Sequence, residues 1–199
     1  DRNHGEGLYF QNRYGLKRVA DNVIFSVFDS GIHAYGSSKA FLENLIIEGT
    51  ILFHNGIPGA HRTGWGMVVG GGVIARNVTI AHNYSYYPSW FIRSNGIKPS
   101  YGKGTHKLRM NDNYSVGPTP MSIDAQPEDF IAENNVFVGL IKGFSAALPK
   151  EGNSWLMESP RINRTFVRPN KYEPGRASIA IYNWAGADAI AVELKGILN

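Results

Sequence analysis

The sequence predicts an all-β chain: a right-handed parallel β-helix (a solenoid) over residues 1–155, then part of a small antiparallel β-module over residues 156–199. The composition is the first observation behind this prediction. The 199 residues include 23 Gly and 17 Asn, which favour turns, and more Ile and Val than Leu, which favours strands. No segment keeps a helical periodicity over three turns. The third observation is that short alternating segments recur in a fixed order.

Each repeat unit contains three short strands. The first strand of a unit begins at a glycine, in the segments 7–12, 31–36 and 66–71. The second follows an asparagine, at Asn22, Asn44 and Asn77. The third follows an Asn or a substitute for it, at Thr50, Asn83, Asn113 and Asn135. A single coil of this kind cannot bury its apolar face, so we expect the coils to stack into a continuous core.

The asparagines and glycines mark the corners of the coils. Both residue types tolerate left-handed backbone conformations, and an Asn side chain can satisfy backbone groups at a bend. We therefore expect stacked Asn residues to form a ladder along the axis. About five coils are predicted, with insertions at residues 56–66 and 84–107. A β-sandwich with coincidental Asn-Val pairs is the alternative.

The repeat ends near Trp155, and the remaining residues read as an antiparallel module. Strands are expected at residues 165–168, 177–182 and 190–194, with a turn at residues 185–188. The chain opens inside a first coil and stops inside this module. We therefore expect it to be a piece of a longer protein, whose other parts would be among its partners.

Three segments carry a resemblance to a known family: His4-Gly5-Glu6-Gly7-Leu8-Tyr9, residues 31–37 (Gly-Ile-His-Ala-Tyr-Gly-Ser) and residues 168–176 (Arg-Pro-Asn-Lys-Tyr-Glu-Pro-Gly-Arg). They resemble bacterial right-handed parallel β-helix repeat proteins, which are mostly secreted. The resemblance implies an extracellular protein with a polysaccharide as its partner. The wider class includes polysaccharide lyases, glycoside hydrolases, epimerases and adhesins. The chain lacks the paired aspartates of the polygalacturonase-like hydrolases and the Asp-Pro-His-Asp pattern of the alginate epimerases, so the fold alone assigns no activity.

Charge and composition exclude several partners and cofactors. The net charge is +4 with a pI near 9.3, but the basic residues are scattered, so we expect no nucleic-acid partner. No apolar run is long enough for a membrane helix, so no membrane insertion is expected. Without cysteine and with dispersed histidines, no metal site or other cofactor is expected. Asn111-Asp112-Asn113 is the one place where a calcium ion could bind.

The candidate site lies on the outward face of the glycine-initiated strands. Alternation points Tyr9, Gln11, His33 and Tyr35 outward, and His4 and Glu6 come just before them. Aromatic faces stack on sugar rings, while Gln, His and Tyr supply hydrogen bonds, so we expect this surface to bind a glycan. In a lyase mechanism, His33 and Tyr35 would be base and acid, and Arg62 would neutralise a uronate carboxylate.

Two loops extend this candidate site. His61 and Arg62 lie in the first insertion, and Trp90 and Arg93 lie with Lys98 and Tyr101 in an aromatic, basic stretch of the second. This composition suits an acidic glycan. The chain is thus expected to be a polysaccharide lyase or a glycoside hydrolase, and for hydrolysis the nearest carboxylates are Glu6, Asp29 and Glu48. The alternatives are that His33 and Tyr35 are ordinary surface residues and that the chain is a non-catalytic adhesin or scaffold.

Overall fold

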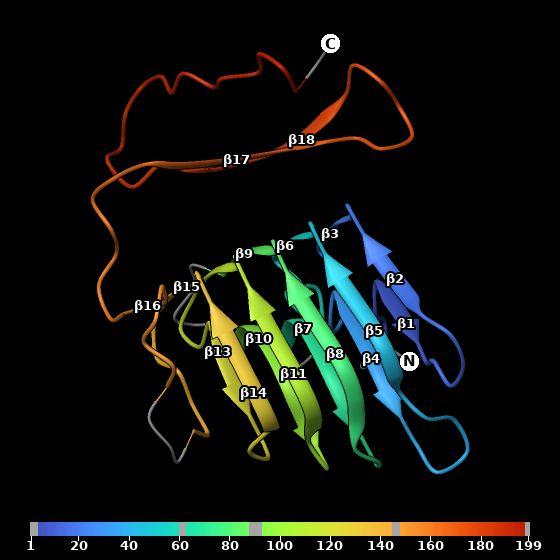
Figure 1. Cartoon of the computed structure of the whole chain (residues 1–199). Coiled ribbons are helices and arrows are strands. Elements are labelled where there is room, and N and C mark those ends of the chain that lie inside the picture. The colour runs from blue at the N-terminus through green and yellow to red at the C-terminus, as the bar shows by residue number, and fades with distance from the viewer. Residues whose placement is uncertain (1–3, 60–62, 88–92, 145–147, 198–199) are drawn as a thin grey trace. The chain divides into compact units, whose positions relative to one another are not determined.

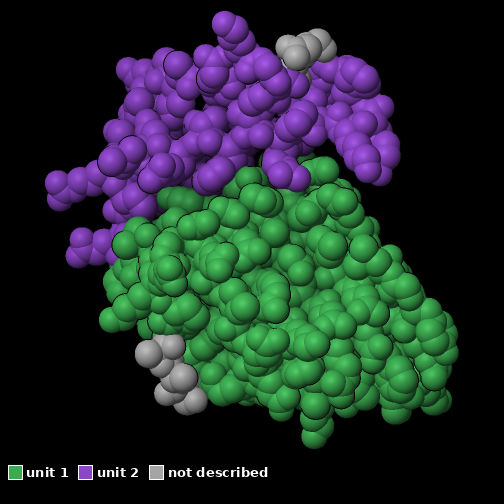
Figure 2. Space-filling view, in the orientation of Figure 1, with its two compact units in different colours: residues 1–157 green, residues 158–199 purple. Residues whose placement is uncertain are grey.

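The computed structural model describes residues 4–59, 63–87, 93–144 and 148–197, and these residues form 18 strands and no helix (Figure 1). Contacts divide the chain into two compact units, residues 1–157 and 158–199, which Figure 2 colours separately. In the first unit, strands pair in parallel into three sheets, an arrangement compatible with a β-helix or solenoid. No helix among the described residues has the length and apolarity needed to cross a bilayer.

Each of five successive turns of the chain contributes one strand to every sheet, and β16 adds a sixth strand to the third sheet. The first sheet contains β1 (Leu8–Phe10), β4 (Ile32–Gly36), β7 (Thr63–Gly71), β10 (Arg93–Gly102) and β13 (Met121–Ile123). The second contains β2 (Lys17–Ala20), β5 (Glu43–Glu48), β8 (Ala75–Ala81), β11 (Thr105–Asn111) and β14 (Glu128–Glu133), whose strands lie side by side in chain order in Figure 1. The third contains β3 (Val23–Phe25), β6 (Ile51–Phe53), β9 (Tyr84–Tyr86), β12 (Tyr114–Val116), β15 (Val136–Val138) and β16 (Ser154–Leu156).

The core lies between the three sheets and is built by alternation along each strand. In the first sheet, Leu8 pairs with Ile32, which pairs with Met67, and the row continues at Ile97. Ile32, Met67 and Ile97 are fully buried, as the alternation of the sequence predicts. Because every coil places an apolar residue at the same register, the core is continuous along the stack.

A glycine row precedes this apolar row, and the packing explains it. A Cβ on Gly31 would come within 2.5 Å of the Asn55 amide nitrogen and 2.7 Å of the Gly66 carbonyl oxygen. A Cβ on Gly96 would come within 2.2 Å of the Pro120 carbonyl oxygen. The glycines that open these strands are therefore required because the backbone of the next coil lies against them.

The predicted asparagine ladder is confirmed. The Asn113 side-chain amide donates to Oδ1 of Asn135 at 2.8 Å, and Oδ1 of Asn113 accepts from the Asn83 amide at 3.0 Å. Asn135 donates in turn to Asn153, and the backbone N–H of Thr50 donates to Asn83. Asn83, Asn113 and Asn135 are buried at this corner, so their amides satisfy backbone groups that water cannot reach.

The left-handed residue at each of these corners is the one before the ladder asparagine. His82, Asp112 and Asn134 all have φ between 53° and 55°. Gly49 and Gly152 take the same conformation before Thr50 and Asn153. Two consecutive residues therefore form each corner: the first adopts the left-handed backbone conformation, and the second provides the polar side chain at the ladder position.

The stretch 84–107, expected to be an insertion, contains β9, β10 and the start of β11. β10 is a full member of the first sheet and pairs in parallel with both β7 and β13. Its register shifts by one residue between Lys98 and Tyr101, which pair with Val68 and Gly70 of β7. This β-bulge interrupts the alternation, which is why sequence periodicity does not reveal the strand. In the other expected insertion, residues 55–58 form turns and β7 begins at Thr63.

The second unit contains one antiparallel pair, β17 (Arg164–Pro169) and β18 (Ala177–Tyr182). Phe166 pairs with Ala180, and the Phe166 and Tyr182 rings meet edge to face at 6.0 Å. Both strands were expected from the sequence. The expected strand at residues 190–194 was wrong, because these residues form no ladder with any strand that the structure describes.

Candidate functional site

Titratable and aromatic side chains gather on the outward face of the first sheet. Register places Tyr9 beside His33, His33 beside Val68, and Val68 beside Lys98, so these residues form one row across four coils. Val68 is only 5% exposed although its side chain belongs to the outward row. The neighbouring side chains therefore cover the middle of this face.

His33 is the centre of the first part of the face. Its Nδ1 lies 3.3 Å from Oε1 of Glu6, and the two side chains are 20% and 11% exposed. Its ring meets Tyr9 and Tyr35 edge to face, at 5.5 Å between centroids in both cases. The Tyr101 ring lies 6.2 Å away on a third side. His33 is thus held by one carboxylate and three aromatic rings.

The other ring nitrogen of His33 has no partner. Nε2 is buried and makes no hydrogen bond, although a buried polar nitrogen normally has one. Nδ1, the nitrogen on the opposite side of the ring, contacts Glu6. This contact orients the imidazole, as a carboxylate does in acid–base catalysts. Nε2 is therefore held beneath the surface of this face without a hydrogen bond, while Nδ1 is oriented by Glu6.

Asp29, in the corner before β4, brings a second carboxyl group near Glu6 and His33. Burial raises the pKa of Asp29 above its ordinary value, and the negative charge of Glu6 raises it further. The charges of His33 and His4 and a hydrogen bond with Ser30 oppose this shift but do not cancel it. Two carboxyl groups in different environments are the arrangement that lets one act as an acid while the other stays ionised.

Tyr35 packs flat against the next coil. A Cβ on Gly71 would lie 2.7 Å from the Tyr35 ring, so the glycine leaves the space that this ring occupies. A Cβ on Gly70 would lie 2.3 Å from the Tyr101 carbonyl oxygen. These two glycines of the Gly70-Gly71-Gly72 run therefore make room for the tyrosine side chain and for the bulged backbone of β10.

A second cluster lies further along the same face. Lys98 Nζ lies 4.7 Å from the centroid of the Trp65 ring and 5.3 Å from that of Tyr101, and it donates a hydrogen bond to Asp124 at 2.8 Å. A cavity of about 550 Å³ opens here. The residues that line it are Trp65, Asn95, Lys98, Pro118, Thr119, Ser122, Ile123, Asp124, Lys142 and Gly143.

The structure brings together part of the site expected from the sequence. Tyr9, His33, Tyr35 and Glu6 converge, and Gln11 joins them through a hydrogen bond to the Tyr9 hydroxyl at 3.4 Å. His4 is exposed, and its charge acts on Asp29. His61, Arg62 and Trp90 lie outside the described residues, and only the backbone of Arg93 is described, in β10.

Sequence reasoning missed two members of the second cluster, Trp65 and Asp124. Trp65 stands just before Gly66, where the sequence pattern places the start of the strand, so the pattern does not assign it to the face. The sequence pattern predicts a loop around Lys98 and Tyr101, whereas both residues belong to β10. Alternation gives no signal for this cluster, because Trp65 lies two residues before the inward Met67 and would be expected on the same side; only the contact with Lys98 reveals it.

No group of three or more His, Asp or Glu side chains is placed to hold a metal ion among the residues that the structure describes. At the proposed calcium position, Oδ1 of Asn113 accepts hydrogen bonds from the backbone and side chain of Asn83. The Asp112 carboxylate lies 3.9 Å from His82. The candidate catalytic groups are therefore the acid–base side chains of the first sheet.

Comparison of the chain with protein-family models, with curated proteins and with solved structures finds no match in any of the three. The function must therefore be argued from the site itself.

Proposed function

We propose that the chain is a bacterial, extracellular, right-handed β-helix protein that binds a polysaccharide along the first sheet and hydrolyses it. The observation that carries the proposal is the convergence of Glu6, His33 and Tyr9 on one outward face, with Asp29 near enough to Glu6 and His33 for their charges to act on its pKa. The right-handed winding follows from the strong preference of parallel crossover connections for that hand. Secretion is inferred from the resemblance of the sequence to secreted β-helix repeat proteins.

Glycan binding is supported by the types of side chain on this face and by their exposure. Tyr9 is 53% exposed and presents a ring on which a sugar can stack. Gln11, hydrogen-bonded to the Tyr9 hydroxyl, adds an amide next to it. Parallel strands spaced by about 4.8 Å present such groups in a regular row, which suits a linear polymer.

Hydrolysis is supported by the different environments of the two carboxyl groups. A glycosidic bond is cleaved when an acid protonates the leaving oxygen while a carboxylate attacks the sugar or activates water. Asp29, with its raised pKa, is suited to deliver the proton. Glu6, oriented by its contact with His33, is the second carboxyl group of the pair, and one water molecule is consumed for each bond cleaved.

The elimination mechanism of a lyase has less support. It requires a cation beside the uronate carboxylate of the same sugar whose proton is removed. Lys98 is separated from His33 by Val68, two strand spacings or about 10 Å, and is already paired with Asp124. The described cations therefore favour hydrolysis over elimination.

One observation favours a non-catalytic glycan-binding surface as the second candidate. The contacts of His33 with Tyr9, Tyr35 and Tyr101 are edge-to-face ring contacts rather than hydrogen bonds, and such packing also serves a purely structural purpose. In that case the face binds sugar and cleaves nothing.

The test is an activity screen on neutral and uronate polysaccharides, following both new reducing ends and the ultraviolet absorbance of unsaturated uronates. We expect reducing ends without absorbance. Glu6→Gln and Asp29→Asn should each lower the rate by about 100-fold or more, because each removes one acid–base group. Glu48→Gln is the matched control, since Glu48 pairs with Arg18 on the second sheet. An increase in ultraviolet absorbance would show that the chain cleaves by elimination and not by hydrolysis. If no product of either kind forms, the catalytic proposal is wrong and only glycan binding remains.

A further inference from the structure

The cavity beside Trp65 lies on the same face as Glu6 and His33 but is separate from them. In register, Lys98 at the cavity is two strands away from His33, which corresponds to about 10 Å. A glycan that follows the row of coils past His33 would therefore reach this cavity with a neighbouring part of its chain. Neither Asp29, Glu6 nor His33 lines the cavity, so we treat it as a binding region next to the acid–base groups.

The charged groups of the cavity are fixed in position. Lys98 lies against the Trp65 and Tyr101 rings, and its side chain is only 15% exposed. One oxygen of Asp124 accepts from Lys98 at 2.8 Å, and the other accepts from the backbone N–H of Gly102 at 3.1 Å. A site whose polar groups are already held loses little freedom when a ligand binds.

The β-bulge in β10 produces this arrangement. It inserts one residue between Lys98 and Tyr101, so both side chains meet on the outward face although three positions separate them. Burial would raise the pKa of Asp124, but the hydrogen bonds from Lys98 and Gly102, with the charge of Lys98, outweigh it and hold the pKa below its ordinary value. The pair is therefore a fixed donor and a fixed acceptor.

The composition of the lining indicates an uncharged sugar. Lys98 and Asp124 compensate each other, and a ligand carboxylate here would meet the Asp124 carboxylate. Trp65 offers an aromatic wall, and Thr119 and Ser122 add hydroxyl groups. Lys142, exposed at the lining, leaves one positive charge in excess, so an acidic sugar is the competing ligand that the experiment must include.

We infer that this cavity is a second, non-catalytic subsite that binds an uncharged pyranose residue through Trp65 and the Lys98–Asp124 pair. The inference rests on the proposed glycan-binding function, and it specifies the class of the substrate and the direction in which the chain lies. Binding should then depend on length, because only an oligosaccharide long enough to span both clusters contacts Trp65.

The experiment titrates the labelled protein with neutral hexose oligosaccharides of two to six residues and with oligogalacturonates of the same lengths, and follows the indole N–H resonance of Trp65 by NMR. We expect this resonance to shift with the longer neutral oligosaccharides. Trp65→Ala should weaken their binding about tenfold and leave the shortest ones unaffected. Asp124→Asn, which keeps the shape of the side chain, should also weaken it.

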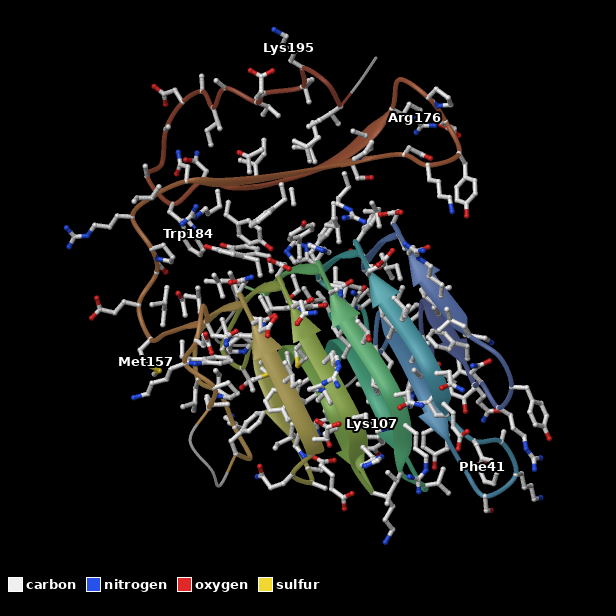
Figure 3. All side chains as sticks on the ribbon, viewed as in Figure 1. Phe41, Lys107, Met157, Arg176, Trp184 and Lys195 are labelled. Carbon is white, nitrogen blue, oxygen red and sulfur yellow. The ribbon has the colours of Figure 1, made fainter. Side chains whose placement is uncertain are left out.

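Two controls keep the outcomes separate. Phe41, labelled in Figure 3, lines a different cavity of about 540 Å³ with Ile74 and Arg76, so Phe41→Ala should leave glycan binding unchanged. Circular dichroism and the midpoint of thermal unfolding check that each variant folds. If neutral oligosaccharides bind and respond to Tyr9→Ala but not to Trp65→Ala or Asp124→Asn, the subsite is refuted while the proposed function stands. Preferential, Trp65-dependent binding of oligogalacturonates refutes the uncharged class, and no binding of any glycan refutes both proposals.

Discussion

Asn113 shows at the scale of one residue how the corners stabilise the fold. Its amide donates to the Ile80 carbonyl at 2.8 Å and to Asn135, and its Oδ1 accepts from Asn83. The Asn113 side chain is only 1% exposed, so water cannot replace these hydrogen bonds if the side chain is removed. A buried polar group that loses its partner costs about 1–3 kcal/mol.

Asn113→Ala is therefore expected to lower the free energy of unfolding by about 2–3 kcal/mol, because it removes the side-chain donor to the Ile80 carbonyl and the acceptor for the backbone N–H of Asn83. Urea denaturation measures this change. The matched control is Asn111→Ala: Oδ1 of Asn111 is buried without a hydrogen bond, so its removal should leave the free energy of unfolding unchanged or raise it. Equal losses in the two variants would show that the ladder hydrogen bonds contribute nothing specific.

Asp29 predicts a pH dependence of stability. Because its pKa is higher in the folded chain, the folded state holds a proton more tightly than the unfolded state. Stability from this group is then fully present below the ordinary value of 3.8 and is lost as pH rises through the raised pKa. Asp29→Asn should be more stable than the parent at neutral pH, with the difference vanishing below pH 3.8, as followed by denaturation at several pH values. A difference that is constant across this range would contradict the raised pKa.

At the scale of the element, the glycine row sets how closely neighbouring coils approach. Gly31→Ala should destabilise the chain by about 1–3 kcal/mol, since the new methyl group would meet the Gly66 backbone and Asn55. Gly72→Ala is the control, because its Cβ would lie 3.5 Å from the nearest atom, the Tyr35 hydroxyl oxygen. The midpoints of thermal unfolding of both variants test this prediction. If Gly31→Ala unfolds at the same temperature as the parent, the coils can move apart without loss of stability.

The elements also show how far sequence reasoning reaches. The rows that contain Ile32 and Asn113 could be predicted because each coil repeats the same residue type at the same corner or register. β10 could not, because its bulge at Lys98 to Tyr101 breaks the alternation on which strand prediction relies. The contact of Glu6 with His33 bridges two coils, so only the register of β1 and β4 reveals it.

At the scale of the whole molecule, the two units differ in the means by which they are stabilised. The first has a continuous core with fully buried residues such as Ile47, Ile80 and Met110, whereas the second has one pair of strands. A two-stranded sheet is marginally stable by itself. We therefore predict faster amide hydrogen exchange in β17 and β18 than in β7 and β8. Equal protection in the two units would contradict this.

The central claim is that the outward face of the first sheet binds a glycan, and an NMR titration with oligosaccharides tests it most directly. The predicted result is that the His33 ring resonances and the amides of β1 and β4 shift on binding, and that His33→Ala together with Tyr9→Ala abolishes the response. Shifts confined to the second or third sheet, or no binding across a broad panel of neutral and acidic oligosaccharides, would contradict the claim.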